Sequence, residues 1–231
     1  HHQIHKMNRD VRVAACQFQP TIGDVDANVD AVDRSLSSLP DTVEIAVFPE
    51  LAATGYDLDI AGELAAAVPG ALTDRFVDTA REYGTTIVIG VPERDADALY
   101  NTLAVIDADG VKAKYRKQHP WGDESGVFAT GDGPTTIDTK AGTLGLALCY
   151  DLNFPELALE YARVGCDILA VSAAWRRTFE TDWRLLTRAR ALDGPYYVAG
   201  SNHVGNQDGR IHAGGSLIAD PTGSVLSEAK A

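Results

Sequence analysis

Three residues that could act together in catalysis each follow a β-rich run of the sequence. Cys149 comes directly after residues 143–148 (TLGLAL), Glu50 follows residues 44–48 (EIAVF) and one proline, and Lys117 ends the second strand of a predicted hairpin. Reactive side chains of α/β proteins tend to lie where strands run out into loops. A thiol is a nucleophile, a carboxylate can accept its proton, and an ammonium can stabilise negative charge. The set therefore indicates nucleophilic catalysis by a cysteine.

The sequence after Cys149 predicts a tight turn from a strand into a helix. Asn153 is expected to be the N-cap, with Pro155 near the helix start and Glu156 at its third position. We expect the positive end of this helix to lower the pKa of the thiol and favour the thiolate. The backbone N–H of Tyr150 is expected to face an oxyanion. The alternative for Cys149 is a small cysteine buried in the core.

Glu50 and Lys117 each have an ordinary structural alternative as well. A carboxylate placed just beyond an apolar strand is partly desolvated, and desolvation raises its pKa toward the range useful for a general base. The alternative is a solvated glutamate at a strand end. Lys117 could stabilise developing negative charge, or it could belong to a solvated cationic patch with Lys112, Lys114 and Arg116.

The elements that would position these residues predict an α/β fold with a mixed sheet, or two sheets, and helices outside. Strands are predicted at residues 11–17, 44–48, 86–91, 143–148, 167–172 and 196–201, helices at residues 26–38, 72–83, 155–164 and 181–192, and hairpins at residues 100–115 and 215–226. Thr73 is expected to cap the second helix and Gly84 to end it. A dinucleotide-binding fold is not expected, because residues 17–23 (QFQPTIG) lack the turn G-x-G-x-x-G.

Composition narrows the classes of partner. The chain has 231 residues and a net charge of −13, from 33 acidic and 20 basic residues. Nucleic acid is not expected as a partner, because phosphate binding relies on clustered Lys and Arg. Such a surface resembles those of proteins from salt-loving organisms, although an ordinary acidic cytosolic enzyme is the alternative. No apolar run is long enough to span a membrane, so no membrane partner is expected.

The cysteine and histidine content indicates a reducing compartment and no metal site. Cys16, Cys149 and Cys166 form no C-x-x-C pair, which favours a cytoplasmic location over a disulfide framework. Catalysis without a metal or organic cofactor is expected, because the histidines show no H-E-x-x-H or comparable spacing. Residues 1–6 (HHQIHK) look like the remnant of an expression tag, and residues 7–231 are expected to form one domain.

A series of sequence motifs, in order, resembles the nitrilase or carbon–nitrogen hydrolase superfamily and covers nearly the whole chain from Arg12 to Gly223. They begin with VAACQFQP in the first predicted strand and VFPELAATGY around Glu50. KYRKQHPWGDE surrounds Lys117, and LGLALCYDLNFPEL surrounds Cys149. AVSAAW with TDWRLLTRARALDGPYYVAGSN, and finally GGSLIADPTG, complete the set. A single motif would be weak evidence, but their shared order is strong.

The resemblance implies a four-layer αββα sandwich, a Glu50–Lys117–Cys149 triad, and a homodimer or larger homo-oligomer. It also implies a second glutamate soon after the lysine, which positions substrate or water and keeps the lysine charged. Glu124 fits this place, and Asp123 is the alternative because the offset varies between branches. Family members usually continue for some tens of residues beyond the last hairpin, whereas this sequence stops at Ala231.

The implied reaction is hydrolysis of a non-peptide carbon–nitrogen bond in a small amide through a cysteine thioester. The family's nitrilases more often carry Trp-Glu after the nucleophile, so Tyr150-Asp151 favours an amidase over a nitrilase. Arg176 or Arg177 could hold a substrate carboxylate, as in an ω-amidase or a carbamoyl-amino-acid hydrolase. An acyltransferase or a catalytically silent binding protein could also be built on the same fold. Residues that match positions lining family pockets are Tyr56, Trp121, Trp175 and Asn202.

Overall fold

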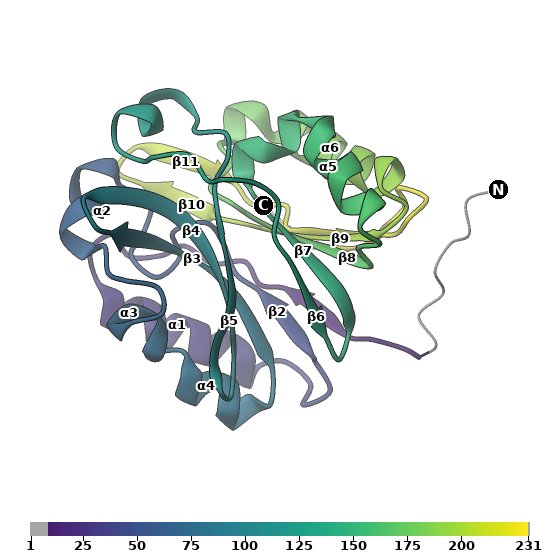
Figure 1. Cartoon of the computed structure of the whole chain (residues 1–231), viewed down its shortest axis with the longest axis horizontal. Coiled ribbons are helices and arrows are strands. Elements are labelled where there is room, and N and C mark those ends of the chain that lie inside the picture. The colour runs from purple at the N-terminus through teal and green to yellow at the C-terminus, as the bar shows by residue number, and fades with distance from the viewer. Residues whose placement is uncertain (1–8, 231) are drawn as a thin grey trace.

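Two β-sheets packed face to face form the centre of the protein in the computed structural model, which describes residues 9–230 (Figure 1). The first sheet has the strand order β1 (Val13–Ala15), β2 (Ile45–Val47), β3 (Thr86–Asp95), β4 (Ala98–Asp107) and β5 (Gly110–Arg116). The second has the order β13 (Val225–Glu228), β12 (Leu217–Ala219), β9 (Tyr197–Asn202), β8 (Ile168–Ala173), β7 (Gly142–Leu148) and β6 (Thr136–Thr139). A separate hairpin joins β10 (Val204–Gln207) and β11 (Arg210–Ala213).

Strand direction brings several strand ends to the same end of the sandwich. β1, β2 and β3 are parallel, and β3, β4 and β5 form an antiparallel meander, so β5 runs in the direction of β2. In the other sheet β7, β8 and β9 are parallel. The Ser172 hydroxyl near the end of β8 donates to the Phe48 carbonyl after β2 at 2.5 Å. This bond joins the sheets where their strands run out into loops.

Helices cover the outer face of each sheet and complete four layers. α1 (Val25–Ser37) and α4 (Val77–Tyr83) pack on the first sheet, and α5 (Pro155–Arg163) and α6 (Glu180–Asp193) pack on the second (Figure 1). The short helices α2 (Leu58–Leu64) and α3 (Ala71–Asp74) lie on the side of the first sheet. Apolar side chains from both sheets meet between them, among them Val47, Val88, Leu146 and Ile168. The fold is therefore the predicted αββα sandwich.

Local structure departs from the sequence prediction at the second predicted helix. It is divided into α3 and α4. Thr73 is not its N-cap, because Gly70 is the N-cap of α3 and the Thr73 hydroxyl accepts from the Gly70 N–H at 3.0 Å. Gly84 ends α4 with a φ of 62°, as predicted. Between residues 9 and 230 no helix has the length and apolar character needed to cross a membrane. The predicted tag, residues 1–6, lies outside the described residues.

Candidate active site

Four strands end around one point between the sheets, and each is followed within three residues by a residue of the site. Glu50 follows β2, Lys117 follows β5, Cys149 follows β7, and Ala174 follows β8. The carboxyl ends of parallel strands in neighbouring positions open onto a shared crevice. The structure therefore brings together the three side chains that the sequence analysis singled out, although they are far apart in the chain.

A buried lysine lies between two buried carboxylates. The Lys117 ammonium is 2.7 Å from Glu50 Oε1 and 2.8 Å from Glu124 Oε2, and all three side chains are at most 3% exposed. A buried charge is tolerated when it is paired and its hydrogen-bonding capacity is used. Burial disfavours the ammonium, but Glu50, Cys149 and Glu124 outweigh it and raise the pKa of Lys117 well above its ordinary value. Lys117 is therefore held as a cation.

Glu50 is fixed by donors on every side. Oε1 accepts from Asn101 Nδ2 at 2.8 Å as well as from Lys117, and Oε2 accepts from the Ala174 N–H at 3.0 Å. The Cys149 thiol lies beside the same carboxylate. Burial raises the pKa of Glu50 above its ordinary value, against the opposing effect of Lys117. A carboxylate with a raised pKa that contacts the thiol is suited to accept its proton.

The backbone around Glu50 leaves no room for a side chain on the neighbouring strand. A Cβ on Gly90 of β3 would lie 2.2 Å from the Leu51 nitrogen and 2.7 Å from the Glu50 Cα. Leu51 itself has a φ of 47°, in the left-handed region. Such backbone persists only where the surrounding structure determines it, and it is concentrated at functional sites. Gly90 thus allows β3 to approach the turn that carries Glu50.

Glu124, and not Asp123, is the acidic residue on Lys117. Its side chain is buried and accepts from the Tyr56 hydroxyl at 2.7 Å and from the Trp121 N–H at 2.6 Å, whereas Asp123 is exposed. The short 3₁₀ helix η1 (Gly122–Gly126) turns Glu124 inward. The structure therefore decides between the two acidic residues that the sequence left open.

Cys149 begins the 3₁₀ turn η2 (Cys149–Asn153), which precedes α5. Its φ of 46° is in the left-handed region, which a residue with a Cβ rarely adopts. Burial, and then the Glu50 carboxylate, raise the pKa of the Cys149 thiol well above its ordinary value, although Lys117 lowers it. The expectation of a thiolate favoured by a helix end was therefore wrong, because desolvation and a neighbouring carboxylate outweigh the cation.

The predicted cap of the following helix was also wrong. The N-cap of α5 is Phe154 and makes no side-chain capping bond, while the Asn153 amide donates to the Tyr150 carbonyl at 3.3 Å. Asn153 instead closes η2. Pro155 is the first residue of α5, as predicted. The extra turn between Cys149 and α5 separates the sulfur from the helix end.

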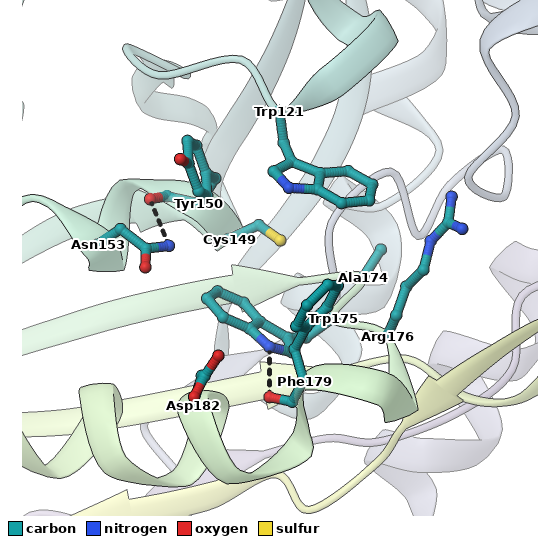
Figure 2. Close-up of a pocket in the computed structure, with 9 residues that line it drawn as sticks. All are labelled: Trp121, Cys149, Tyr150, Asn153, Ala174, Trp175, Arg176, Phe179 and Asp182. Carbon is teal, nitrogen blue, oxygen red and sulfur yellow. Dashed lines mark hydrogen bonds between the residues drawn. The ribbon is translucent and has the colours of Figure 1, made fainter.

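A cavity of about 160 Å³ opens onto Cys149. Figure 2 shows the sulfur pointing into it between Trp121 on one side and Trp175 with Phe179 on the other. Arg176 and Asp182 lie on opposite sides of the cavity in this view (Figure 2). The remaining residues that line it are Tyr150, Asn153 and Ala174. The walls are mostly apolar, with few polar groups, as in sites for small molecules.

Two of the four predicted pocket residues lie behind the cavity and not in its lining. Tyr56 donates to Glu124 and is 7% exposed. Asn202 is fully buried; its Oδ1 accepts from the Trp175 N–H at 2.7 Å, and its Nδ2 donates to the Gly214 carbonyl at 2.8 Å. These residues hold Glu124 and Trp175, whereas Trp121 and Trp175 line the cavity themselves.

The other two cysteines are core residues. Cys16 and Cys166 are at most 8% exposed, and burial raises the pKa of each thiol to about 12. Neither lines the cavity. In the part of the chain that the structure describes, no three His, Cys, Asp or Glu side chains are grouped as metal ligands.

Several residues of the site were missed at the sequence level. Asn101 binds Glu50, but an asparagine within the apolar strand β4 was the only signal for it. His203 and His212 donate from their rings to the carbonyls of Glu50 and Ala174, and burial lowers the pKa of His203 to about 3 and that of His212 to about 4. Both rings are therefore neutral, and they hold the backbone of the site.

Comparison with known proteins decides the family. The sequence pattern of the family described as Carbon-nitrogen hydrolase matches residues 12–231. The chain belongs to the carbon–nitrogen hydrolase family. Membership of this nitrilase superfamily agrees with the resemblance drawn from the motifs, and its curated relatives include amidases.

Relatives and solved structures of the carbon–nitrogen hydrolase family match most of the chain. Omega-amidase NIT2 of Homo sapiens is 36% identical over 80% of this chain and 72% of its own length. Nit3 of Saccharomyces cerevisiae, a nitrilase-superfamily member, has a TM-score of 0.88 at 30% identity, over 95% of this chain and 86% of its own. A variant of an amidase from Nesterenkonia, with a TM-score of 0.89 at 26% identity over the same shares, carries the acetamide moiety of fluoroacetamide covalently on its active-site cysteine.

Proposed function

We propose that this carbon–nitrogen hydrolase cleaves a small amide through a thioester on Cys149. The observation that supports this most strongly is the packing of the Cys149 thiol against Glu50, with the Lys117 cation 2.7 Å from the same carboxylate. Of these three residues Cys149 lines a cavity that is large enough only for a small substrate, and Glu50 and Lys117 are buried next to it without lining the cavity. Nucleophile, base and cation are thus assembled before substrate arrives.

The first half of the proposed reaction forms the thioester. Glu50 accepts the thiol proton while the Cys149 sulfur attacks the amide carbon, and the carbonyl oxygen becomes an oxyanion. The Lys117 ammonium and the Tyr150 backbone N–H stabilise this charge. The tetrahedral intermediate then collapses, the carbon–nitrogen bond breaks, and Glu50 returns the proton to the departing ammonia or amine.

The second half releases the acid. Glu50, again a carboxylate, takes a proton from water, whose oxygen attacks the thioester carbon. Collapse of the second tetrahedral intermediate breaks the carbon–sulfur bond, and the proton on Glu50 returns to the sulfur. Glu124 keeps Lys117 charged and in place throughout, because it contacts the ammonium with both oxygens, at 3.0 and 2.8 Å.

The pH dependence of kcat/KM tests this assignment of the base. Burial raises the pKa of Glu50, so we expect activity on a neutral amide to fall in acid, as Glu50 becomes protonated, at a pH above the ordinary glutamate pKa of 4.5. The pKa values of Cys149 and Lys117 are both raised well above their ordinary 9.0 and 10.5, so no loss is expected as the pH rises to 9. Ammonia release from propionamide, measured between pH 4 and about 10, gives the profile. An activity that declines between pH 7 and 9 would contradict a protonated resting thiol.

We also propose that the preferred substrate carries a carboxylate, held by Arg176. Arg176 lines the cavity, and its guanidinium carbon lies 5.1 Å from the centre of the Trp121 ring. Within residues 9–230 it pairs with no carboxylate, whereas the neighbouring Arg177 lies 3.9 Å from Glu180. The relatives named omega-amidase fit this substrate class. Asp182 also lines the cavity, but it is exposed and therefore better screened by water.

Replacing Arg176 by glutamine should remove this preference. We expect kcat/KM for succinamate to fall about 10–100-fold, mainly through KM, because a charge-assisted hydrogen bond is lost. Butanamide, in which a methyl group replaces the carboxylate, should react within about 2-fold of wild type, because nothing charged meets the arginine. Arg177→Gln is the matched control and should leave both substrates unchanged. Equal losses on both amides would refute the carboxylate assignment, and a panel that includes nitriles and N-carbamoyl compounds separates the competing substrate classes.

A further inference from the structure

A buried carboxylate outside the reacting groups binds both sides of the site. Asp151, two residues after Cys149, is 1% exposed. Its Oδ2 accepts from the Leu148 N–H at 3.0 Å and from the Tyr115 hydroxyl at 2.7 Å. Its Oδ1 accepts from the His119 N–H at 3.0 Å and contacts His119 Nδ1 at 2.8 Å. One side chain thus joins the turn that carries the nucleophile to the segment that carries Lys117.

His119 binds the same turn at a second point. Its ring stacks on Phe154, with the ring centroids 3.6 Å apart and an angle of 10° between the planes. Phe154 ends the turn that Cys149 begins, and its N–H donates to the Asp151 carbonyl at 3.1 Å. The histidine therefore contacts both the middle and the end of η2, through a hydrogen bond and through a stacked face.

The contacts of Asp151 lie on both sides of Lys117 and directly before Cys149, so they can control the position of both residues. Tyr115 and His119 lie two residues before and two residues after Lys117, and both bind Asp151. Cys149 has a left-handed backbone with a φ of 46°, and such a conformation persists only when neighbouring contacts determine it. Leu148, whose N–H binds Asp151, directly precedes it. The network spans the two backbone segments whose separation sets the distance from sulfur to ammonium.

We infer that Asp151 and His119 are positioning residues. Together they form a clamp that holds the turn η2, which begins at Cys149, against the segment around Lys117, and so fixes the position of the Cys149 sulfur. The inference rests on the proposed function and adds residues that touch neither sulfur nor substrate. A purely structural role is the competing explanation, because any buried carboxylate with several donors stabilises a fold. Asp167 offers a comparison, since its Oδ2 accepts from the Thr143 N–H at 2.8 Å near the other end of β7.

The test compares kcat, KM and the rate of Cys149 alkylation by iodoacetamide in His119→Ala, His119→Asn, Asp151→Asn and Asp167→Asn. We expect His119→Ala and Asp151→Asn to lower kcat about 10–100-fold with KM within about 3-fold, since small displacements of reacting groups cost this much. The rate of Cys149 alkylation should also differ from that of the wild type in these two variants. His119→Asn retains a donor that can reach Asp151 and should recover most of kcat. Asp167→Asn should lose thermal stability and keep kcat.

The outcomes separate the clamp from the proposed function. Wild-type protein without amidase activity would reject the proposed function itself. Active wild type together with a kcat within 2-fold of it in both His119→Ala and Asp151→Asn would reject the clamp, and so would an equal loss of kcat in Asp167→Asn. If His119→Ala does not fold, His119→Asn and Tyr115→Phe replace it in the test. The clamp predicts a near-normal kcat for His119→Asn and a kcat several-fold lower for Tyr115→Phe. A low kcat in His119→Asn or a normal kcat in Tyr115→Phe would overturn it.

Discussion

Cys149→Ala is expected to abolish amide turnover while the fold is retained. The sulfur points into the cavity and lies beside the Glu50 carboxylate, and no other thiol lines that cavity. Removal of the nucleophile of a covalent mechanism commonly lowers kcat by about 10⁶-fold. Ammonia release from succinamate and from butanamide measures the loss, and circular dichroism with a thermal melt verifies that the variant is folded.

Cys166→Ala is the matched control for this substitution. Cys166 is 7% exposed, lies in the core beneath α5, and packs with Gly145 and Tyr161. Its removal should cost some stability and leave kcat unchanged. Titration of wild-type protein with a thiol reagent should show one accessible cysteine that is missing in Cys149→Ala. Normal turnover by Cys149→Ala would remove the basis of the mechanism.

The second large effect is expected from Lys117→Met. Methionine keeps most of the volume of the side chain but leaves Glu50 and Glu124 facing each other without a cation. Loss of one oxyanion donor costs about 10²–10³ in kcat, and an uncompensated buried charge costs about 3–5 kcal/mol of stability. We therefore expect both a nearly inactive enzyme and a lower melting temperature, measured by ammonia release and by calorimetry.

Two further variants separate these effects on activity and stability. Lys117→Met combined with Glu124→Gln removes one of the two unpaired carboxylates, so it should recover part of the melting temperature and none of the activity. Lys114→Met is the matched control, because Lys114 belongs to the same hairpin but lies outside the site, 2.5 Å from Glu93. This variant should leave kcat unchanged. Substantial activity in Lys117→Met at a pH where it is folded would exclude the lysine as the oxyanion partner.

The main features of the site could be predicted because they follow from strand ends and ordered motifs. Glu50 and Cys149 each follow an apolar strand, Lys117 follows the second strand of a hairpin, and the topology places those strand ends together. Their convergence depends only on strand direction and sheet packing. The pattern of strands and helices predicted a mixed sheet or two sheets, the two hairpins and the helix end at Gly84, and the family resemblance implied the four-layer sandwich.

The features that the sequence analysis missed depend on contacts between side chains from distant parts of the chain, and a pattern of residue types does not reveal such contacts. Asp151 reads as an ordinary turn residue until Tyr115 and His119 are placed against it. The pKa of Cys149 followed from burial beside Glu50, which outweighed the helix end that local sequence suggested. Asn153 has the chemistry of a helix cap, yet the intervening 3₁₀ turn uses it instead. Local propensity was correct where no tertiary contact competed with it.

Partitioning of the acyl group between water and hydroxylamine tests the thioester most directly. If Cys149 forms one common acyl-enzyme, the ratio of hydroxamate to acid at a fixed hydroxylamine concentration must be the same for the amide and the methyl ester of one acid, because the leaving group has already departed. We predict equal ratios, and no hydroxamate from Cys149→Ala. Ratios that differ with the leaving group, or hydroxamate formed at the wild-type rate without Cys149, would contradict the proposed mechanism.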